Sequence, residues 1–355
     1  MVSAAAEGGQ KFVAIVSRSD YNRIRPLADG KDRGRSMIEL NHGMRIIGTE
    51  LWLDSTKARP LGFISHAHGD HTAKHERIIA TPATWSLCRR RLGVKPHAIP
   101  LDFRTPHSMD GFTIELLPSG HILGAAQIVI QNGRRIVYTG DFKLKPNRTA
   151  DPAEVPSCDI LIMECTFGKP QYVFPPTEEV ERRLIEFVET AFEDRKIPVL
   201  LAYAMGKSQE VLKFLGDRGY TVCLAKPTVE VVKVYESCGV VFRNYERFSN
   251  DNLHGKVVLL PPYLARTRLV ERIPKRRTAV LTGWAMDREA ASRYGADVAI
   301  PMSDHADFEE LNEYVDRARP SRIFTVHGAP DFARHLRRRG FHAEHLAPGT
   351  QLELW

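Results

Sequence analysis

Short apolar runs, each closed by turn residues, constrain the fold of this chain more than any other feature. Runs of this kind recur along the sequence at Leu61–Ser65, Thr113–Leu117, Arg135–Thr139, Ile160–Met163, Val298–Pro301 and Ile323–Val326. Runs of four or five residues with such ends predict buried or half-buried strands. Helical patterns lie between them at Thr177–Phe192, after Gly206 and at Phe308–Ala318. This order of strands and helices predicts an α/β fold with layered sheets.

Composition excludes several classes of protein but decides little about partners. With 43% hydrophobic and 8% aromatic residues over 355 positions, the chain is neither collagen-like nor disordered, and its length suits about two domains. A net charge of +7 favours a polyanionic partner. The five cysteines form no C-x-x-C pair, and no run of 18 apolar residues occurs. We therefore expect a cytoplasmic protein without a membrane partner or a signal peptide.

The segment 175–297 has a character of its own. It contains a complete strand–turn–helix unit and further strands, and residues suited to chemistry resume only after it. We expect it to be a domain inserted into another one. The predicted division is an N-terminal extension at 1–40, the first part of one domain at 41–174, the insertion at 175–297 and the rest of the first domain at 298–355.

The strongest local signal for chemistry is the loop that follows the strand LGFIS. Within six residues it places His66, His68, Asp70 and His71. Imidazole and carboxylate groups together suit Zn²⁺ or a similar divalent ion. His66 and His68 are two apart and can point to one side of an extended turn, while Asp70 and His71 can turn toward a second ion. The alternative, a polar surface loop rich in histidine, does not explain four residues of ligand type at the end of a buried strand.

Three further residues of ligand type stand just past other strands: His121, Asp141 and His327. Gly120 and Gly140 precede two of them and permit tight turns. Seven candidates are too many for one tetrahedral ion, so the set predicts two ions with an aspartate between them.

These motifs, taken in order, resemble those of a known family. HAHGDH, SGH, TGDF and the earlier LDST with Asp54 are similar to the motifs of the metallo-β-lactamase fold. Glu164 in ECTFG, His305 in MSDHAD and His327 in VHG resemble the additional motifs of the β-CASP nucleases, the branch that includes ribonuclease J, the cleavage-and-polyadenylation endonuclease, Artemis and bacterial ligase-associated exonucleases. The resemblance implies a metallo-β-lactamase αββα sandwich with an inserted α/β β-CASP domain.

The resemblance also implies roles for these residues. Two divalent ions, Zn²⁺ or else Mn²⁺, would be held by two ligand sets that share Asp141: His66, His68 and His121 for one ion, and Asp70, His71 and His327 for the other. His305 would be the general acid, oriented and kept charged by Glu164. Asp54 would fix the metal loop from behind its ligands. Plain structural roles stay open for Glu164, as an ion-pair partner, and for Asp54, as a turn residue.

Other residues carry weaker signals. Lys207 and Ser208 open a helix after Gly206, in the segment AMGKSQE, which resembles a turn of the β-CASP domain. They could bind a phosphate of a nucleic acid, or they could simply begin the helix. Asp304, which precedes His305, is interpreted as a cap or packing residue, and His75 as a surface residue. The basic clusters Arg89–Arg91, Arg272–Arg277 and Arg334–Arg339 could contact a phosphate backbone or be solvated surface.

The function that these features favour is a two-metal nuclease that hydrolyses phosphodiester bonds of single-stranded nucleic acid. The segments around Glu164 and His305 resemble bacterial ligase-associated enzymes and favour a DNA exonuclease of the repair type, while a histidine at His327 also suits an RNA nuclease of the 3′-end-processing type. DNA-repair or RNA-processing proteins are the expected partners. A small-molecule metallo-hydrolase would need neither the insertion nor the pair of His305 and Glu164. A non-catalytic nucleic-acid-binding subunit should have lost metal ligands, and all seven are present.

Overall fold

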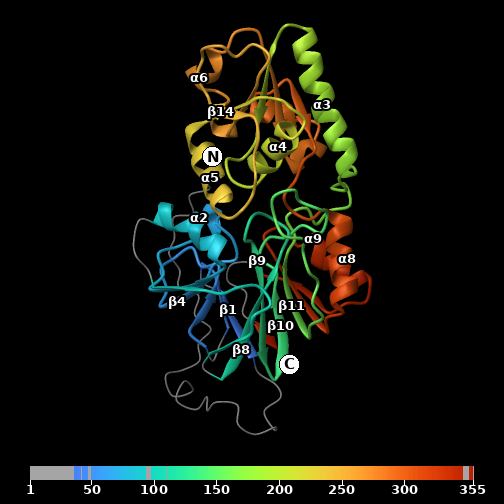
Figure 1. Ribbon diagram of the computed structural model, residues 1–355. Coiled ribbons are helices and arrows are strands. Elements are labelled where there is room, and N and C mark those ends of the chain that lie inside the picture. The colour runs from blue at the N-terminus through green and yellow to red at the C-terminus, as the bar shows by residue number, and fades with distance from the viewer. Residues whose placement is uncertain are drawn as a thin grey trace.

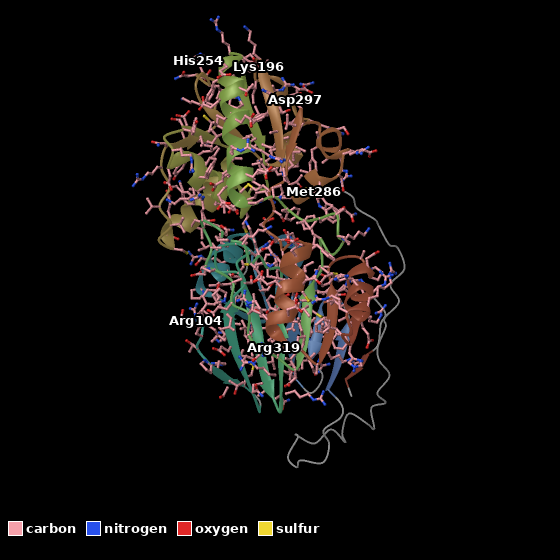
Figure 2. All side chains as sticks on the ribbon, turned by 90° about the vertical axis from the view of Figure 1, so that its right-hand side faces the viewer. Arg104, Lys196, His254, Met286, Asp297 and Arg319 are labelled. Atoms are coloured by element: carbon pink, nitrogen blue, oxygen red, sulfur yellow. The ribbon has the colours of Figure 1, made fainter. Side chains whose placement is uncertain are left out.

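The computed structural model describes residues 36–40, 42–46, 49–92, 97–109, 111–346 and 352–354. These residues form two lobes, of which the lower contains two sheets and the upper a third (Figure 1). In the view turned by 90°, Lys196 and His254 lie at the far end of the upper lobe, while Arg104 and Arg319 lie on the lower lobe (Figure 2). Residues 1–35, which make up most of the predicted N-terminal extension, lie outside the described residues.

The first sheet of the lower lobe has the strand order β20-β1-β2-β3-β4-β5-β6. The pairs β3–β4, β4–β5 and β5–β6 are parallel, so the carboxyl ends of these strands lie along one edge. The bounds are β1 Ser36–Leu40, β2 Met44–Ile46, β3 Leu51–Leu53, β4 Leu61–Phe63, β5 Arg77–Ala80, β6 His97–Pro100 and β20 Leu352–Leu354.

The second sheet has the order β19-β18-β11-β10-β9-β8-β7 and packs face to face on the first. Alternate residues of its strands point into the shared core, as Ile128 and Ile130 do, whereas Val129 between them points to the opposite face. The bounds are β7 His107–Met109, β8 Phe112–Pro118, β9 Ala126–Asn132, β10 Arg134–Tyr138, β11 Ile160–Glu164, β18 Arg322–Val326 and β19 Ala343–His345.

Helices cover the outer faces of both sheets. α8 (Phe308–Ala318) and α9 (Asp331–Arg338) bury apolar residues such as Tyr314 and Phe332 against the second sheet. α2 (Pro82–Leu92) packs its Leu87 with Ile78 of the first sheet. The layers run helix, sheet, sheet, helix, which confirms the predicted α/β sandwich.

The third sheet builds the upper lobe and is parallel throughout, with the order β14-β13-β15-β12-β16-β17. Helices lie on both of its faces, and neighbouring residues such as Val258 and Leu259 pack into different apolar clusters. The bounds are β12 Ile197–Leu201, β13 Val222–Leu224, β14 Tyr245–Arg247, β15 Val257–Leu260, β16 Arg276–Leu281, β17 Val298–Ile300, α3 Thr177–Glu193, α4 Lys207–Gly216, α5 Lys226–Ser237, α6 Arg268–Glu271 and α7 Ala290–Tyr294.

The two lobes share buried contacts. One apolar cluster contains Leu87 of α2 together with Tyr235 of α5. Nearby, the Tyr235 hydroxyl accepts a hydrogen bond from the backbone N–H of Leu123, at 3.4 Å. Lys143, in the loop after β10, lies 3.5 Å from Glu210 of α4, and both side chains are buried. Within the described part of the chain, no helix is long and apolar enough to cross a membrane.

Candidate metal centre

The ends of strands gather the polar residues of the site. Asp54 follows β3, and the loop with His66 follows β4, its parallel neighbour. In the second sheet Glu164 is the last residue of β11, which lies between parallel β10 and β18. Asp141 and His327 come just after those two strands. Because parallel strands bring their carboxyl ends to one edge, residues far apart in sequence meet where the two sheets face the upper lobe.

The Asp54 carboxylate is a buried acceptor behind the metal loop. It accepts from the Ser65 backbone N–H at 2.7 Å, the Ser65 hydroxyl at 2.5 Å, His71 Nδ1 at 2.8 Å and the Tyr138 hydroxyl at 2.8 Å. Since the hydroxyl proton of Ser65 goes to Asp54, Ser65 Oγ must accept from His66 Nδ1, 2.9 Å away. His66 and His71 therefore both carry a proton on Nδ1 and turn Nε2 to the other side.

Backbone carbonyls hold two other rings of the cluster. His68 Nε2 lies 3.3 Å from the carbonyl oxygen of Met205, and His121 Nδ1 lies 2.7 Å from that of Asp304. A carbonyl oxygen only accepts, so these two nitrogens carry the protons. The lone pairs of the rings are left on His68 Nδ1 and His121 Nε2.

The three nitrogens without protons, the Nε2 of His71 and one carboxylate converge. His68 Nδ1 lies 3.0 Å from His66 Nε2 and 3.1 Å from His121 Nε2. Asp141 Oδ2 is 3.4 Å from His66 Nε2 and 3.3 Å from His71 Nε2, and its partner Oδ1 is buried without a hydrogen bond to any described residue. Ligand atoms about 2 Å from a tetrahedral ion stand about 3.3 Å apart. The residues present therefore fit a divalent cation, and four of them offer ligand atoms all within 4.8 Å of one another: His66, His68, His121 and Asp141.

Burial and charge shape the protonation of this cluster. Burial lowers the pKa of His66 well below its usual value and, with the neighbouring rings of His305 and His68, lowers that of His121 to about 3. Although burial opposes it, nearby histidines hold the pKa of Asp141 well below its usual range. These groups are thus neutral imidazoles and a carboxylate, the forms that bind a metal ion. His71 differs, because Asp141 and Asp54 outweigh its burial and raise its pKa well above the ordinary value.

The other predicted ligands lie on the open side of the cluster. Asp70 Oδ2 is 3.9 Å from His71 Nε2, and the Asp70 side chain is 80% exposed. The ring centroid of His327 is 5.0 Å from that of His71, and His327 is exposed with a left-handed φ of 53°. The structure thus gathers the first predicted ligand set closely around Asp141 and leaves Asp70 and His327 more loosely placed beside His71.

Glu164 and His305 form a pair at the edge of the cluster. His305 Nδ1 lies 2.9 Å from Glu164 Oε2 and 3.8 Å from Asp141 Oδ2. Glu164 is fully buried and also accepts from the backbone N–H of Phe142 and the hydroxyl of Thr166. Against the effect of its burial, Glu164 and Asp141 raise the pKa of His305 to about 10. The ring is therefore charged at neutral pH, and its Nε2 makes no hydrogen bond among the described residues.

Two residues hold positions that sequence reasoning missed. Asp304 is buried, and both its carbonyl and its carboxylate face the cluster, where its side chain groups with those of His121 and His305. Its place next to His305 in MSDHAD was the only signal in the sequence. His75, interpreted as a surface residue, is buried with its ring against Gly62, and neither ring nitrogen has a hydrogen bond to a described residue. The surface interpretation of His75 was wrong.

Lys207 and Ser208, predicted to contact nucleic acid, both make contacts inside the protein. Lys207 Nζ lies 2.9 Å from Asp304 Oδ1, with both side chains buried. Ser208 Oγ donates to the carbonyl oxygen of Tyr203 at 2.6 Å. A phosphate at this position would have to displace these partners, so their contact with nucleic acid stays a prediction.

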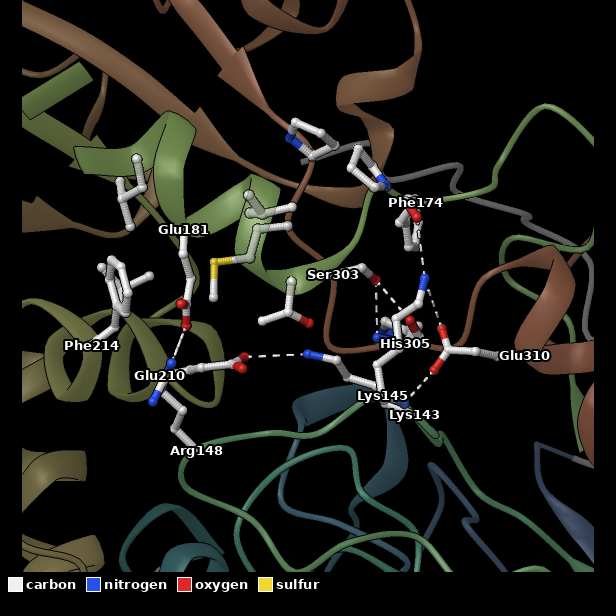
Figure 3. A pocket seen from close by; sticks show the side chains of 17 residues that line it. Lys143, Lys145, Arg148, Phe174, Glu181, Glu210, Phe214, Ser303, His305 and Glu310 are labelled. Atoms are coloured by element: carbon white, nitrogen blue, oxygen red, sulfur yellow. Dashed lines mark hydrogen bonds and ion pairs between the residues drawn. The ribbon is translucent and has the colours of Figure 1, made fainter. Parts of the chain in front are cut away.

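Beside His305, a pocket of about 50 Å³ lies between the lobes (Figure 3). Three cations line it, and each is paired. Lys143 lies by Glu210, Lys145 by Asp307 and Arg148 by Glu181. Figure 3 shows the pairs of Lys143 with Glu210 and Arg148 with Glu181, and it shows Lys145 beside Glu310. The pocket therefore offers little uncompensated charge to an anion.

A basic groove of about 280 Å³ lies between the loop after Glu164 and α9. Its walls include Lys169, Arg334 and Arg338. Arg334 pairs with Asp331 at 2.9 Å, whereas Lys169 and Arg338 have no ion pair among the described residues. The loop that carries Lys169 begins beside the cluster, since Thr166 bonds both Glu164 and the carbonyl of His327. This groove thus combines free positive charge with a position near the candidate metal centre.

Comparisons with known proteins agree on one family. Residues 298–348 match the family described as Zn-dependent metallo-hydrolase RNA specificity domain. Over 322 residues the chain is 40% identical to a protein of Opitutus terrae named probable DNA ligase, with 89% of this chain but 32% of that protein aligned. It is 25% identical over 349 residues to probable RNase MJ4 of Methanocaldococcus jannaschii, covering 75% of this chain and 81% of that one. The chain thus spans about a third of the length of the Opitutus relative.

A solved structure has the same fold. It is the crystal structure of a protein of unknown function from Enterococcus faecalis V583, with a TM-score of 0.56 and 15% identity. The match covers 83% of this chain and 81% of the other. The likeness therefore extends over both lobes.

Proposed function

Because the chain belongs to the metallo-β-lactamase-fold β-CASP family of nucleases, we propose that it is a metal-dependent phosphodiesterase acting on single-stranded nucleic acid. One observation carries the proposal. Ring nitrogens without protons from His66, His68 and His121 lie 3.0 to 3.1 Å apart in neighbouring pairs, with Asp141 Oδ2 3.4 Å from His66 and 3.9 Å from His121, spacings close to those around a tetrahedral ion. Such a cluster of bare ligand atoms is costly to bury unless a cation occupies it.

Two divalent ions, Zn²⁺ most simply, would share Asp141. His66, His68 and His121 would hold one ion, and the more open set of Asp70, His71 and His327 the other. When bound, such ions lower the pKa of water and neutralise charge on phosphoryl oxygens. The chain itself supplies the fixed geometry, since Asp54 holds the rings of His66 and His71 in the required tautomers.

His305 is the proposed general acid and Glu164 its orienting partner. Glu164 holds Nδ1 and favours the charged ring, which leaves the proton on Nε2 for the departing ribose or deoxyribose oxygen. Two nearby cations would lower the pKa of this ring from about 10 toward neutrality, where it can both give and regain a proton.

Single-stranded DNA is the substrate we favour, with removal of nucleotides from an end. The support is the 40% identity to a protein named as a DNA ligase, because processing of an end precedes its sealing. An RNA nuclease is the alternative, supported by the RNA specificity domain over residues 298–348 and by the relative named as an RNase. DNA-repair or RNA-processing proteins would be the corresponding partners.

The basic groove defined above would hold phosphates of the strand beside the scissile bond. Lys169 and Arg338 are free to make such contacts, whereas the cations of the inter-lobe pocket are already paired. Contacts of this kind give affinity without base specificity and weaken as salt rises.

A digestion time course tests the function. DNA and RNA of one single-stranded sequence, each labelled separately at the 5′ and the 3′ end, are incubated with the metal-free protein, with Zn²⁺ or Mn²⁺ added, and with a chelator control. Labelled mononucleotide released early from one end of the DNA is the expected result and gives the polarity. Preferred cutting of RNA would move the protein to the alternative. If the protein binds metal but cuts neither polymer, the proposal fails.

A further inference from the structure

The side chains of Ser208 and Gln209 brace the turn between β12 and α4. Ser208 Oγ donates to the carbonyls of Tyr203 and Ala202, at 2.6 Å and 3.3 Å. Gln209 accepts from the Gly206 backbone N–H at 2.7 Å and donates to the Ala204 carbonyl at 3.0 Å. The motif AMGKSQE therefore builds a braced turn, and Ser208 and Gln209 are committed to holding its shape.

Gly206 is the point at which this turn meets the lower lobe. Its φ of 88° and ψ of −86° lie where residues with a side chain are strained. A Cβ at this position would meet Ile122 Cγ2 at 2.4 Å and Asp304 Oδ2 at 3.3 Å. Ile122 directly follows His121, so only glycine lets the upper lobe approach this closely to a candidate ligand.

The close approach puts two groups of the turn in contact with the metal cluster. On one side the Met205 carbonyl accepts from His68 Nε2 and thereby leaves the lone pair on Nδ1. On the other side Lys207 neutralises the buried carboxylate of Asp304, whose carbonyl holds His121 Nδ1. Two of the three closely grouped histidines thus depend on residues 205–207 of the upper lobe.

We infer that the Gly206 turn is an outer support of the metal centre, so that docking of the upper lobe fixes the ligand geometry of His68 and His121. The role of Lys207 is then to position the ligand loop rather than to bind phosphate. The inference rests on the proposed function only in requiring that the cluster binds metal. It makes Met205, Gly206 and Lys207 positioning residues, since none of them would touch the ion.

Metal affinity is the readout that separates this role from others. The metal-free protein is titrated with Zn²⁺ in competition with a chromophoric chelator, beside the variants Gly206→Ala and Gly219→Ala. Gly219 is a matched control, because its φ is 90° but a Cβ there would meet no atom within 4 Å. Loss of an outer partner of a ligand typically weakens metal binding ten- to hundredfold. We expect at least a tenfold loss for Gly206→Ala and less than a twofold change for Gly219→Ala.

If Gly206→Ala does not fold, as judged by its thermal transition, two further variants test whether Lys207 supports the metal centre. Lys207→Met leaves Asp304 unpaired, and adding Asp304→Asn removes the uncompensated charge. We expect Lys207→Met to weaken Zn²⁺ binding and the double variant to recover most of it. If Lys207→Met keeps its Zn²⁺ affinity but binds single-stranded DNA less tightly, with a smaller salt dependence, Lys207 binds phosphate and the inference is overturned. Equal Zn²⁺ affinities for the Gly206 and Gly219 variants would also overturn it. Failure of the wild-type protein to bind Zn²⁺ would instead refute the proposed function.

Discussion

Replacing Asp54 with asparagine should weaken metal binding although Asp54 touches no metal. The carboxylate accepts from four donors, three of them on Oδ2: the Ser65 hydroxyl, His71 Nδ1 and the Tyr138 hydroxyl. Asparagine keeps one oxygen and places an NH₂ group at the other position, so in either orientation a donor faces a donor. The Tyr138 hydroxyl can turn and accept. With the NH₂ group on the Oδ2 side, the Nδ1–H of His71 cannot, and the ring must move its proton to Nε2, the atom that faces Asp141. With the NH₂ group on the Oδ1 side, it instead faces the backbone N–H of Ser65.

The disturbance also reaches His66. If the Ser65 hydroxyl turns away from residue 54, its proton points at His66 Nδ1, 2.9 Å away, and favours the wrong tautomer of that ring as well. Two ligand rings are thus affected. Removing a hydrogen-bond partner of a metal ligand typically weakens metal binding ten- to hundredfold, or by about 1.4 to 2.8 kcal/mol. The charge-assisted hydrogen bonds lost from the folded protein should lower its free energy of unfolding by about 1 to 3 kcal/mol.

Tyr138→Phe is the matched control for Asp54→Asn. It removes one of the four donors to Asp54 and leaves the donors that set both ring tautomers in place. We expect its free energy of unfolding to fall by about 1 kcal/mol and its Zn²⁺ affinity to change less than threefold. Isothermal titration of both metal-free variants with Zn²⁺ makes the comparison. Equal affinities for Asp54→Asn and Tyr138→Phe would refute control of the ligand tautomers by Asp54.

Three other predictions address catalysis, folding and binding. His305→Ala should keep its metal by elemental analysis and lose most turnover, whereas Asp141→Ala should lose metal too; equal metal loss in both would contradict the general-acid role. Burial lowers the pKa of His75 to about 4, so as the pH falls from about 6.5 to about 4 the unfolded chain gains a proton that the folded protein does not, and stability drops by up to about 3 kcal/mol. His75→Leu should make the free energy of unfolding, measured by urea titration, fall less steeply across this range, while the buried His66 and His121 keep part of the fall. The same pH dependence in wild type and variant would contradict this role of His75. Arg338→Ala should weaken binding of single-stranded DNA and reduce the salt slope by about 1, while Lys196→Ala, at the far end of the upper lobe (Figure 2), should do neither.

Much of the site could be predicted because its signals are local. His66, His68, Asp70 and His71 share one loop, and the other three ligands, His121, Asp141 and His327, come one to three residues after a strand. Once parallel strands are expected, their carboxyl ends must meet, and the ligands with them. Glu164 was identifiable through the resemblance of ECTFG and not through its chemistry, since an acid that ends a strand suits many roles.

What sequence reasoning missed depends on contacts between distant segments. His68 and Met205 are 137 positions apart, and His121 and Asp304 are 183 positions apart. In both pairs the acceptor is a backbone carbonyl, which every residue possesses, so residue type gives no sign of it. Lys207 shows the same limit, because a lysine that opens a helix suits a phosphate as well as it suits a buried aspartate.

The dependence of DNA cleavage on added metal tests the proposed activity most directly. Metal-free protein is mixed with end-labelled single-stranded DNA and given increasing equivalents of Zn²⁺ or Mn²⁺, with Asp141→Ala treated alongside. We predict no cleavage without metal, a rate that rises until two equivalents are bound, and no cleavage by Asp141→Ala at any of these concentrations. Cleavage that persists in excess chelator, or that is retained by Asp141→Ala, would contradict a phosphodiesterase centred on Asp141.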